Sequence, residues 1–368
     1  MSRKIKLGVV GCGCISEIYL QNLTRLFRNV EVVACMDLIR ERSEQRAAQF
    51  GVPTVYEPDE FYRDPQIELV VNLTTPQSHT EVDNLSIDAG KNVYSEKPKG
   101  LNKAAAEAVI KKAKSKGLIV GGAPETFLGG GLQTCRKLID DGWLGDIVGA
   151  TAFMMGHGHE SWHPDPEFYY QFGGGPMYDM GPYYLTALVS MLGPVKKVSG
   201  ATRISFPTRT ITSEKKYGNI INVEIPTYVT GNLTFASGAI GTIITTFDTW
   251  DSTLPRIEIY GSRGTLLVPD PNTFGGPVMF KRPGMQDWAE IPLLFGYKEN
   301  SRGIGVSDMA QSLIDGRTHR AHGDMALHVL DIMESIHTSN DTEKIITLST
   351  TCTRPAPFPM GLTDGYID

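Results

Sequence analysis

The chain has 368 residues, with 35 Lys and Arg, 41 Asp and Glu and a formal net charge of −6, and 41% of its residues are hydrophobic. This length predicts two globular domains, each large enough to bury its own core. The slight negative charge argues against nucleic-acid binding and against a basic membrane surface, and no apolar run approaches the roughly 20 residues that a bilayer-spanning helix needs.

No apolar leader segment follows the first residues, so we expect a cytoplasmic protein. The five cysteines do not form a disulfide framework, because their number is odd and their positions are scattered. We interpret them as small buried thiols in a reducing compartment, and we expect no metal site at the closely spaced pair. They are Cys12, Cys14, Cys35, Cys135 and Cys352.

Short apolar runs alternate with helical stretches in the first third of the chain. Strands are predicted at residues 5–10, 30–36, 54–56, 69–73, 92–95 and 118–121, and helices at 15–27, 40–49, 79–89 and 103–114. Strand–helix alternation with apolar strands predicts right-handed crossovers and a parallel sheet that is covered on both faces. The fold class is therefore α/β, with a doubly wound Rossmann domain over residues 1–125.

The pattern changes after residue 125, where longer runs alternate between apolar and polar side chains. Strands are predicted at 148–155, 227–235, 239–246, 257–260 and 265–268, and helices at 132–141, 179–191 and 323–336. Such runs are typical of a half-buried sheet. We predict a C-terminal α+β domain over residues 126–368, with a large open, mostly antiparallel sheet.

A glycine-rich turn follows the first strand. Gly11 permits a tight turn, and Gly13 lets the backbone approach a pyrophosphate at the positive end of the next helix. Ser16 is the small residue that keeps this helix close to the strand. Cys14 and Ile15 complete the predicted phosphate-binding turn, for which an ordinary βαβ turn is the alternative.

Asp37 directly follows the second strand. A carboxylate at this place accepts hydrogen bonds from ribose hydroxyls and repels a 2′-phosphate. We therefore predict NAD as the cofactor, while the nearby Arg40 leaves NADP as the alternative.

Three later motifs occur in a specific order. Thr74, Thr75 and Pro76 follow the fourth strand, with His79 shortly after, and Glu96-Lys97-Pro98 follows the fifth strand. The segment GGGPMYDMGPYY occupies residues 173–184. Together they resemble the glucose–fructose oxidoreductase/inositol dehydrogenase/rhizopine-catabolism (Gfo/Idh/MocA) family over nearly the full chain.

The resemblance implies a Rossmann domain followed by a domain whose open sheet faces the nicotinamide and often forms the oligomer interface. We therefore expect a homo-oligomer, either a dimer, a tetramer or a larger assembly. Family members oxidise or reduce one hydroxyl–carbonyl pair on a sugar, polyol or related small molecule. Thr74, Thr75, Pro76, His79 and Glu96 are expected around the cofactor, with His79 either covering the ribose or nicotinamide or lying on the surface.

Lys97 is the predicted acid/base. A hydride leaves a carbinol carbon only if the hydroxyl proton is removed in step, which requires a group whose pKa lies near the working pH. A partly desolvated Lys beside a nicotinamide cation has its pKa lowered toward that range. We expect Lys97 to accept the proton in oxidation and to donate it in reduction, with Glu96 positioning the backbone and the cofactor.

Asp179 and Tyr183 are the other predicted catalytic residues. The resemblance implies that Asp179 binds the substrate hydroxyl, and a plain helix N-cap is the alternative. Tyr183 stands where the family usually has His. A Tyr hydroxyl can donate to a substrate oxygen and relay a proton, but it titrates near 10, so more of the acid/base work falls to Lys97.

The loop at residues 156–164 contains three His residues and a Glu in an HxHExxH arrangement. A metal site is conceivable there, but the family chemistry needs no metal, so none is predicted. We predict that His157, Trp162 and His163 contact the substrate, Trp162 by stacking on a sugar and His163 as a hydrogen-bond partner or the missing imidazole. A loop that only packs is the alternative. Glu125, after the sixth strand, is predicted to face the same cleft.

These residues predict an NAD-dependent dehydrogenase that oxidises a secondary hydroxyl of a sugar, glycoside or cyclitol. We favour C3 of a pyranoside, giving a 3-keto sugar, because the aromatic side chains between residues 162 and 172 suit a bulky glycoside. One alternative is a self-recycling oxidoreductase or isomerase with tightly bound NAD. The other is a non-catalytic NAD- and sugar-sensing protein, suggested by Tyr183 in place of His.

Overall fold

The N-terminal part of the chain folds into a six-stranded parallel sheet in the order β3-β2-β1-β4-β5-β6. The structure is a computed structural model that describes residues 3–368. The strands are β1 (Ile5–Val10), β2 (Val30–Met36), β3 (Thr54–Val55), β4 (Leu69–Asn72), β5 (Asn92–Ser95) and β6 (Val120–Gly122). The helices between them are α1 (Ser16–Arg25), α2 (Arg40–Phe50), α3 (Pro58–Phe61), α4 (His79–Asp88) and α5 (Lys103–Ser115).

This strand order reverses between β1 and β4, which is the switch point of a doubly wound sheet. All four residues of β4 are buried and five of the six in β1 are buried, as expected for strands covered on both faces. The carboxyl ends of β1, β2, β4 and β5 therefore meet at one edge of the sheet. The predicted cofactor motifs all follow these ends.

The C-terminal part forms a nine-stranded sheet in the order β16-β15-β14-β13-β7-β12-β11-β8-β17. Its strands are β7 (Ile147–Met155), β8 (Val195–Arg203), β11 (Tyr228–Phe235), β12 (Ile240–Thr246), β13 (Ile257–Gly261), β14 (Gly264–Val268), β15 (Val278–Lys281), β16 (Ala289–Ile291) and β17 (Ile346–Thr347). Only β7 and β12 pair in parallel. The predicted fold class is confirmed.

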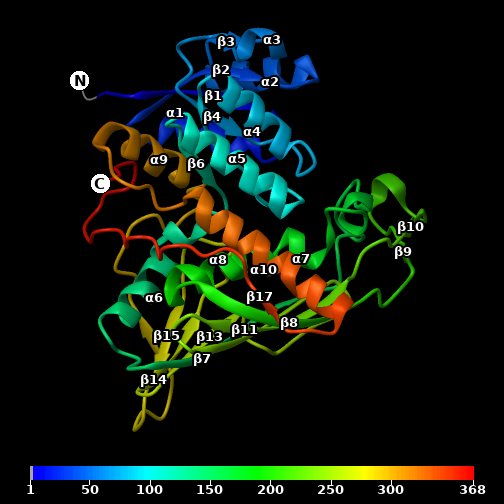
Figure 1. The fold of residues 1–368 in the computed structure, drawn as a ribbon, viewed down its shortest axis with the longest axis vertical. Helices are drawn as coiled ribbons and strands as arrows, with labels where there is room; N and C mark the ends of the chain where they lie inside the picture. Colours follow the sequence, from blue (N-terminus) through cyan, green and yellow to red (C-terminus); the bar gives the residue numbers. More distant parts are fainter. Residues whose placement is uncertain (1–2) are drawn as a thin grey trace.

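Helices lie between this sheet and the N-terminal domain (Figure 1). They are α6 (Gly130–Asp140), α7 (Gly175–Asp179), α8 (Gly181–Leu192) and α10 (Gly323–Thr342), with the 3₁₀ turn η1 (Thr126–Leu128). The 3₁₀ turn η2 (Glu167–Tyr170) contacts α7 and the β10 strand (Ile220–Asn222). Buried and more exposed residues alternate along β11, so its strand packs against the helices on one face only. The other face of the sheet leaves Val148 and Ile240 exposed.

A small antiparallel arm extends from the second domain between β8 and β11. It consists of β9 (Thr208–Thr210) and β10 (Ile220–Asn222), with the 3₁₀ turn η3 (Glu214–Lys216) between them. The arm was not predicted, because its strands have only three residues each. Figure 1 shows it at the side of the molecule, next to the loop that precedes α7.

Several predicted element boundaries are wrong, and the helix predicted at 323–336 extends to Thr342. The helix predicted at 179–191 is two helices, because α7 ends at Asp179 and α8 begins at Gly181, with Pro182 in its first turn. Proline has no N–H to give and favours the start of a helix, so the new helix begins there. The strand predicted at 118–121 begins later, at Val120.

A helix from the end of the chain returns to the first domain. The unpredicted α9 (Ile304–Asp315) packs against β1 and β6, beside the N-terminal sheet in Figure 1. The division near residue 125 stays a prediction. In the structure, the first domain's core includes residues from beyond residue 300.

Candidate active site

The glycine turn between β1 and α1 is built for close approach. Gly11 has φ +92°, and a Cβ added there would lie 2.7 Å from the backbone carbon of Leu73. Only glycine combines that backbone conformation with that contact. A Cβ added at Gly13 would meet no protein atom within 4 Å. Packing within the chain therefore does not require glycine at this position, whereas a phosphate resting on the backbone would.

Ser16 and the two neighbouring residues complete the turn. The Ser16 hydroxyl donates to the carbonyl oxygen of Gly13 at 2.6 Å and is fully buried, which holds the N-terminus of α1 against the sheet. Ile15 is half-buried. Cys14 is an exposed free thiol, so the expectation that all five cysteines are buried is wrong for this one. It lies on the outer side of a turn whose inner side is packed on β1.

Asp37 lies at the end of β2, beside the same turn. Its carboxylate accepts the backbone N–H of Cys12 at 2.7 Å and that of Ile39 at 2.8 Å. Each oxygen keeps a further lone pair, so the group can also accept ribose hydroxyls. Arg40 is directed to Glu44, at 2.8 Å, and to Glu57. Because Arg40 is already paired, it is less available for the 2′-phosphate of NADP. Asp37 and Arg40 together therefore fit NAD better than NADP.

His79 does not lie where the sequence suggested. It is fully buried, with Nδ1 2.8 Å from the carbonyl oxygen of Pro98 and Nε2 3.0 Å from that of Thr74. A ring enclosed in this way cannot cover the nicotinamide or the ribose, and it is not a surface group. It connects the loop of Thr74, Thr75 and Pro76 after β4 to the loop of Lys97 after β5.

Lys97 and Asp179 meet across the two domains. Nζ of Lys97 donates to the carboxylate Oδ1 of Asp179 at 2.9 Å and to its backbone oxygen at 2.7 Å. The side chains are only 17% and 15% exposed. On the other side, Oδ2 of Asp179 lies 3.4 Å from Nε2 of His159. The carboxylate thus stands between an ammonium group and an imidazole.

The charges in this group shift its proton equilibria. Burial lowers the pKa of Lys97, but the negative charge of Asp179 and the nearby Tyr183 and Glu96 raise it more, so the net shift is upward. Burial raises the pKa of Asp179, but Lys97 and His159 hold it well below its usual range. The expectation that Lys97 has a lowered pKa is therefore wrong for the chain by itself: its own groups favour the ammonium form.

Tyr183 presents its ring rather than its hydroxyl to this pair. Nζ of Lys97 lies 5.2 Å from the Tyr183 ring centroid, a distance at which a ring face attracts a cation. Burial raises the pKa of Tyr183, and Lys97 offsets only part of that shift. Tyr183 is therefore a neutral neighbour of Lys97 near neutral pH.

Two carboxylates lie behind Lys97. Glu96 accepts the Lys97 backbone N–H at 2.9 Å and the Tyr19 hydroxyl at 2.7 Å, so it does hold the backbone. Glu125 is 1% exposed and accepts hydrogen bonds from Tyr94 at 2.8 Å and from the Gly303 backbone at 2.7 Å. Burial raises the pKa of Glu125, and the charge of Glu96 adds to the rise. The prediction that Glu125 faces the cleft is wrong, because its carboxyl group points into the domain core.

The histidine loop between β7 and η2 forms an aromatic wall. His157 stacks on Trp250 with ring centroids 3.4 Å apart, and His159 stacks on Tyr169 at 3.6 Å. Trp162 is 62% exposed and free to offer a ring face. His163 accepts the backbone N–H of Asp165 and does not reach Asp179. Of the three histidines, it is His159 that lies against the reactive pair.

His159 and Trp250 were not among the predicted site residues, and Tyr169 was included only among the aromatic side chains between residues 162 and 172. The HxH spacing was the available signal, since alternate residues of an extended segment point the same way. It did not show which histidine reaches Asp179. Within residues 3–368, no group of three or more His, Cys, Asp or Glu side chains is arranged to hold a metal ion, and no helix is long and apolar enough to cross a bilayer.

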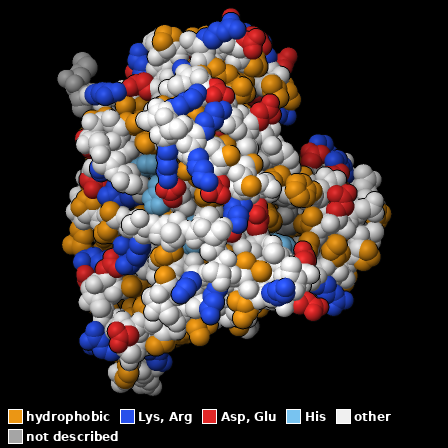
Figure 2. Space-filling view, viewed as in Figure 1, with side chains coloured by type: hydrophobic (Ala, Val, Ile, Leu, Met, Phe, Trp, Pro, Cys, Tyr) orange, Lys and Arg blue, Asp and Glu red, His pale blue; other side chains and the backbone are white. Residues whose placement is uncertain are grey.

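Hydrophobic side chains are exposed around this wall. Figure 2 shows orange atoms on the lobe formed by the arm and the loop before α7, beside the notch that separates this lobe from the N-terminal domain. The exposed residues of these segments include Phe168, Phe172, Phe206, Tyr217 and Ile220. The lobe thus offers apolar surface close to the Lys97–Asp179 pair.

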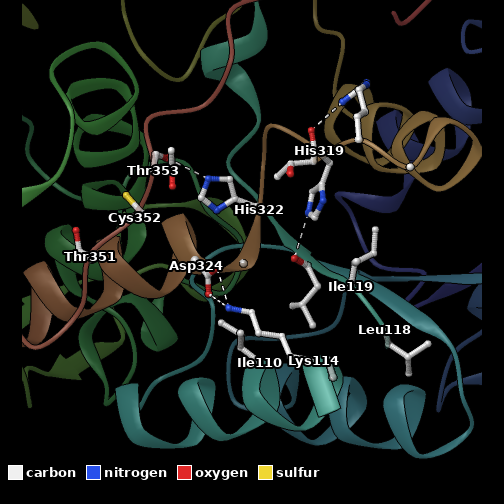
Figure 3. Close-up of a pocket in the computed structure, with 16 residues that line it drawn as sticks. Ile110, Lys114, Leu118, Ile119, His319, His322, Asp324, Thr351, Cys352 and Thr353 are labelled. Carbon is white, nitrogen blue, oxygen red and sulfur yellow. Dashed lines mark hydrogen bonds and ion pairs between the residues drawn. The ribbon is translucent and has the colours of Figure 1, made fainter. Parts of the chain in front are cut away.

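A cavity of about 480 Å³ elsewhere in the molecule shares no lining residue with this site. It lies between α5, β6 and the start of α10 (Figure 3). His319 faces the carbonyl oxygen of Val120 at 3.2 Å, and Lys114 pairs with Asp324 at 2.8 Å. The third charged lining residue, Arg317, pairs with Asp308 at 2.7 Å, so each charged side chain of the lining already has a partner.

Three features define the fold and site of a dinucleotide-dependent oxidoreductase. They are a glycine turn at a Rossmann switch point, an acidic residue after β2 and a mostly buried Lys–Asp pair between the domains. The family profile described as "Oxidoreductase family, NAD-binding Rossmann fold" matches residues 5–122, and the profile described as "GFO/IDH/MocA C-terminal domain" matches residues 132–267. The chain belongs to the Gfo/Idh/MocA family of oxidoreductases, and its first domain is the family's NAD-binding domain.

Several known proteins are similar to parts of the chain. Trans-1,2-dihydrobenzene-1,2-diol dehydrogenase of Mus musculus is 30% identical over 209 residues, 54% of this chain and 60% of that protein. Myo-inositol 2-dehydrogenase of Thermotoga maritima is 24% identical over 268 residues, 72% of this chain and 75% of that protein. The chain spans 60% and 52% of the lengths of two of the curated relatives that it matches.

Solved structures share the whole fold. Levoglucosan dehydrogenase in complex with NADH and levoglucosan superposes with a TM-score of 0.79 at 17% identity, covering 95% of this chain and 100% of that one. An NAD-binding oxidoreductase from Klebsiella pneumoniae gives 0.79 at 19% identity over 94% of this chain and 100% of that one. At this identity the likeness concerns the fold alone.

Proposed function

We propose that the protein is an NAD-dependent dehydrogenase that oxidises a secondary hydroxyl of a sugar, glycoside or cyclitol, with Lys97 as the acid/base. The observation that carries the proposal is the buried Lys97–Asp179 pair. It joins the two domains directly after β5, at the sheet edge where the glycine turn and Asp37 lie. NAD, when bound, supplies the hydride acceptor.

The side chains around Lys97 support this chemistry. The Lys97 ammonium donates a proton to a carbonyl oxygen in the reducing direction, and its amine accepts the hydroxyl proton in the oxidising direction. Asp179 holds Nζ in place through two contacts. Glu96 fixes the Lys97 backbone, and the aromatic wall restricts the access of water to the pair.

The nature of the substrate follows from the surfaces near the pair. Trp162 offers an exposed ring on which the apolar face of a sugar can stack. The relatives named above are dehydrogenases of a cyclic diol and of inositol, both of which carry neighbouring hydroxyls. Exposed aromatic side chains beside the site favour a glycoside with a bulky aglycone, and we propose its C3 hydroxyl as the reacting group. We also propose a homo-oligomer built on the open sheet face and a cytoplasmic location.

The test is NADH formation with NAD and a panel of pyranosides, aryl glycosides, cyclitols and cyclic diols. We expect turnover with at least one class, and Lys97→Met should lower kcat by roughly 10²- to 10⁴-fold, the range of a lost general acid/base. Lys111→Met is the matched control, because the Lys111 side chain is 72% exposed and pairs only with Glu107 within its helix. If Lys97→Met keeps the wild-type rate, the proposed mechanism is wrong.

The two alternatives give different results in the same assay. A self-recycling enzyme or isomerase would convert substrate without added NAD and would retain the cofactor through purification. A sensor would bind NAD and the sugar without forming NADH in a single turnover. Either result would replace the dehydrogenase proposal.

A further inference from the structure

We propose that His159 is the positioning residue of the Lys97–Asp179 pair. Its Nε2 faces Oδ2 of Asp179 at 3.4 Å and thereby orients the carboxylate that sets the place and the charge of Lys97. The inference rests on the proposed function of the same site, since it explains how the predicted acid/base is held. In this chain Tyr183 stands where the family usually has His, and the proposal places the corresponding imidazole in the loop after β7.

The environment of the His159 ring selects one tautomer. His159 is 9% exposed, and its Nδ1 is buried without a hydrogen-bond partner among the described residues. With the proton on Nε2, the ring donates toward Asp179 and leaves only a lone pair unpartnered. With the proton on Nδ1, a buried N–H would be unpaired and a lone pair would face the carboxylate, which is the costlier arrangement. His159 is therefore a donor to Asp179.

Packing prevents the ring from turning away. Tyr169 stacks on one face at a ring distance of 3.6 Å and an interplanar angle of 8°. Phe247 meets the ring edge-on at 4.8 Å. A ring enclosed on two sides keeps the N–H aimed at one acceptor, which is what a positioning group requires.

The residue after His159 anchors the loop. Glu160 accepts the Tyr170 hydroxyl and pairs with Arg209 at 3.0 Å, and Arg209 also binds Asp248. These side chains are less than one-tenth exposed. The arm that carries Arg209 thus fixes the backbone beside His159, so the loop has the rigid support that its sequence did not reveal.

Among residues 3–368, no other side chain supplies this contact. The titratable groups that face Asp179 come from four elements: Lys97 after β5, His159 after β7, Tyr169 in η2 and Tyr183 in α8. Burial raises the pKa of Tyr169 to about 12, and the charge of Asp179 adds to the rise, so Tyr169 stays neutral. Tyr183 turns its ring face to Lys97. In the part of the chain that the structure describes, His159 alone brings a nitrogen to the second carboxylate oxygen.

The experiment compares His159→Phe, which keeps a ring but cannot donate, with His159→Gln, whose amide N–H can. His337→Phe is the control, because Nε2 of His337 is also buried without a partner among the described residues and the residue does not touch the pair. The first readout is the pH dependence of Lys97 labelling by an amine-modifying reagent, followed by mass spectrometry of the Lys97 peptide. It needs neither substrate nor NAD.

In His159→Phe we expect the midpoint pH of Lys97 labelling to fall. The reason is that a carboxylate that has lost its donor no longer holds the Lys97 ammonium group in place. In His159→Gln we expect the midpoint to return toward the wild-type value. With an active substrate, kcat of His159→Phe should fall roughly 10- to 100-fold, the size typical of losing an orienting hydrogen bond. The KM and the NAD affinity should stay within about twofold of wild type.

Two results would overturn the inference: an unchanged labelling midpoint in His159→Phe, or a His159→Gln variant that behaves like His159→Phe, which would make the role one of packing. If His159→Phe does not fold, His159→Met and His159→Gln carry the same comparison, because only the amide donates. Failure of the wild type to form NADH with any substrate would reject the proposed function and leave the labelling result standing.

Discussion

Asp179 is the residue on which the proposed site depends. Its side chain is only 15% exposed, yet it stays ionised because Lys97 and His159 stand on opposite sides of its carboxylate. A buried ion pair is costly to desolvate and costlier to break, since removal of one partner leaves the other unpaired. Retaining such a pair between two domains fits a group that is kept for chemistry rather than for stability.

The raised pKa of Lys97 predicts opposite pH dependences in the two directions. Lys97 must be unprotonated to accept a proton, and its pKa lies above the ordinary value. The kcat/KM for oxidation should therefore rise with pH through the neutral and alkaline range, whereas the kcat/KM for reduction should stay level and fall only at high pH. Initial rates in both directions over one pH series provide the measurement.

Asp179→Asn tests the cause of that shift. Without the carboxylate charge, the pKa of Lys97 should fall, because the largest raising contribution is lost while burial still lowers the pKa. The rise of kcat/KM for oxidation with pH should therefore move to lower pH, even though the maximal rate falls. If this rise stays at the same pH or moves to higher pH, Asp179 does not set the charge of Lys97.

Asp37 is expected to control cofactor choice. Asp37→Ser removes a charged acceptor that faces the expected ribose, which should lower kcat/KM for NAD by roughly 10- to 100-fold, because hydrogen bonds to charged groups are worth about 1.5–3 kcal/mol each. The kcat/KM for NADP should change little or rise. Asp59→Ser, at an exposed position of α3, is the control. Equal losses for both cofactors would mean that Asp37 only holds the turn through Cys12 and Ile39.

At the scale of elements, the arm formed by β9 and β10 matters because it supports the loop after β7. Arg209, from β9, pairs with Glu160 and Asp248 and donates to the carbonyl oxygen of Phe247 at 2.7 Å. The three charged side chains are at most 8% exposed. A short arm with little core of its own is thus fastened by one buried guanidinium.

Arg209→Met should destabilise the protein, because two buried carboxylates lose their partner. Breaking such a network costs about 3–5 kcal/mol, and the measurement is the free energy of unfolding in urea together with the rate of proteolysis in the 156–164 loop. Lys215→Met removes a pair with Asp165 that is 60% and 45% exposed and should cost no more than about 1 kcal/mol. Similar values for the two variants would contradict the anchoring role.

At the scale of the whole molecule, buried neutral histidines connect distant segments. Nε2 of His328, in α10, accepts the backbone N–H of Val195 at 3.0 Å, and Nδ1 lies 3.0 Å from the Thr350 hydroxyl. Burial lowers the pKa of His328 to about 4, and Asp331 offsets only part of that shift. Protonation of Nε2 would remove the acceptor that connects α10 to β8.

This arrangement predicts a loss of stability in mild acid. The unfolded chain binds a proton near pH 6.5 and the folded chain only near pH 4, so stability is lost as the pH falls between these values. From pH 7 to pH 5, His328 should cost roughly 2 kcal/mol. His328→Gln can still accept from Val195, and its urea midpoint should fall less over this range. An equal fall in both proteins would exclude His328 as the cause.

The separate motifs of the candidate site could be predicted because each depends on residues close together in the chain. Gly11 and Gly13 follow a strand, Asp37 ends the next one, and Lys97 follows the fifth, so strand order alone brings them to one sheet edge. The apolar runs likewise predicted the parallel sheet and most of the second one. Helix boundaries near prolines and strands of three residues could not be found, since they carry too few residues for a periodic pattern.

The separate motifs form one site only through contacts between segments that are far apart in the chain. Lys97 and Asp179 are 82 positions apart, and the domains must close on each other before they meet. The same packing turns His79 and Glu125 into the interior, places His159 rather than His163 against Asp179, and raises rather than lowers the pKa of Lys97. Local residue order specifies turns, strands and motif chemistry, but burial and charge depend on which neighbours arrive from elsewhere in the chain, and only the folded chain brings them together.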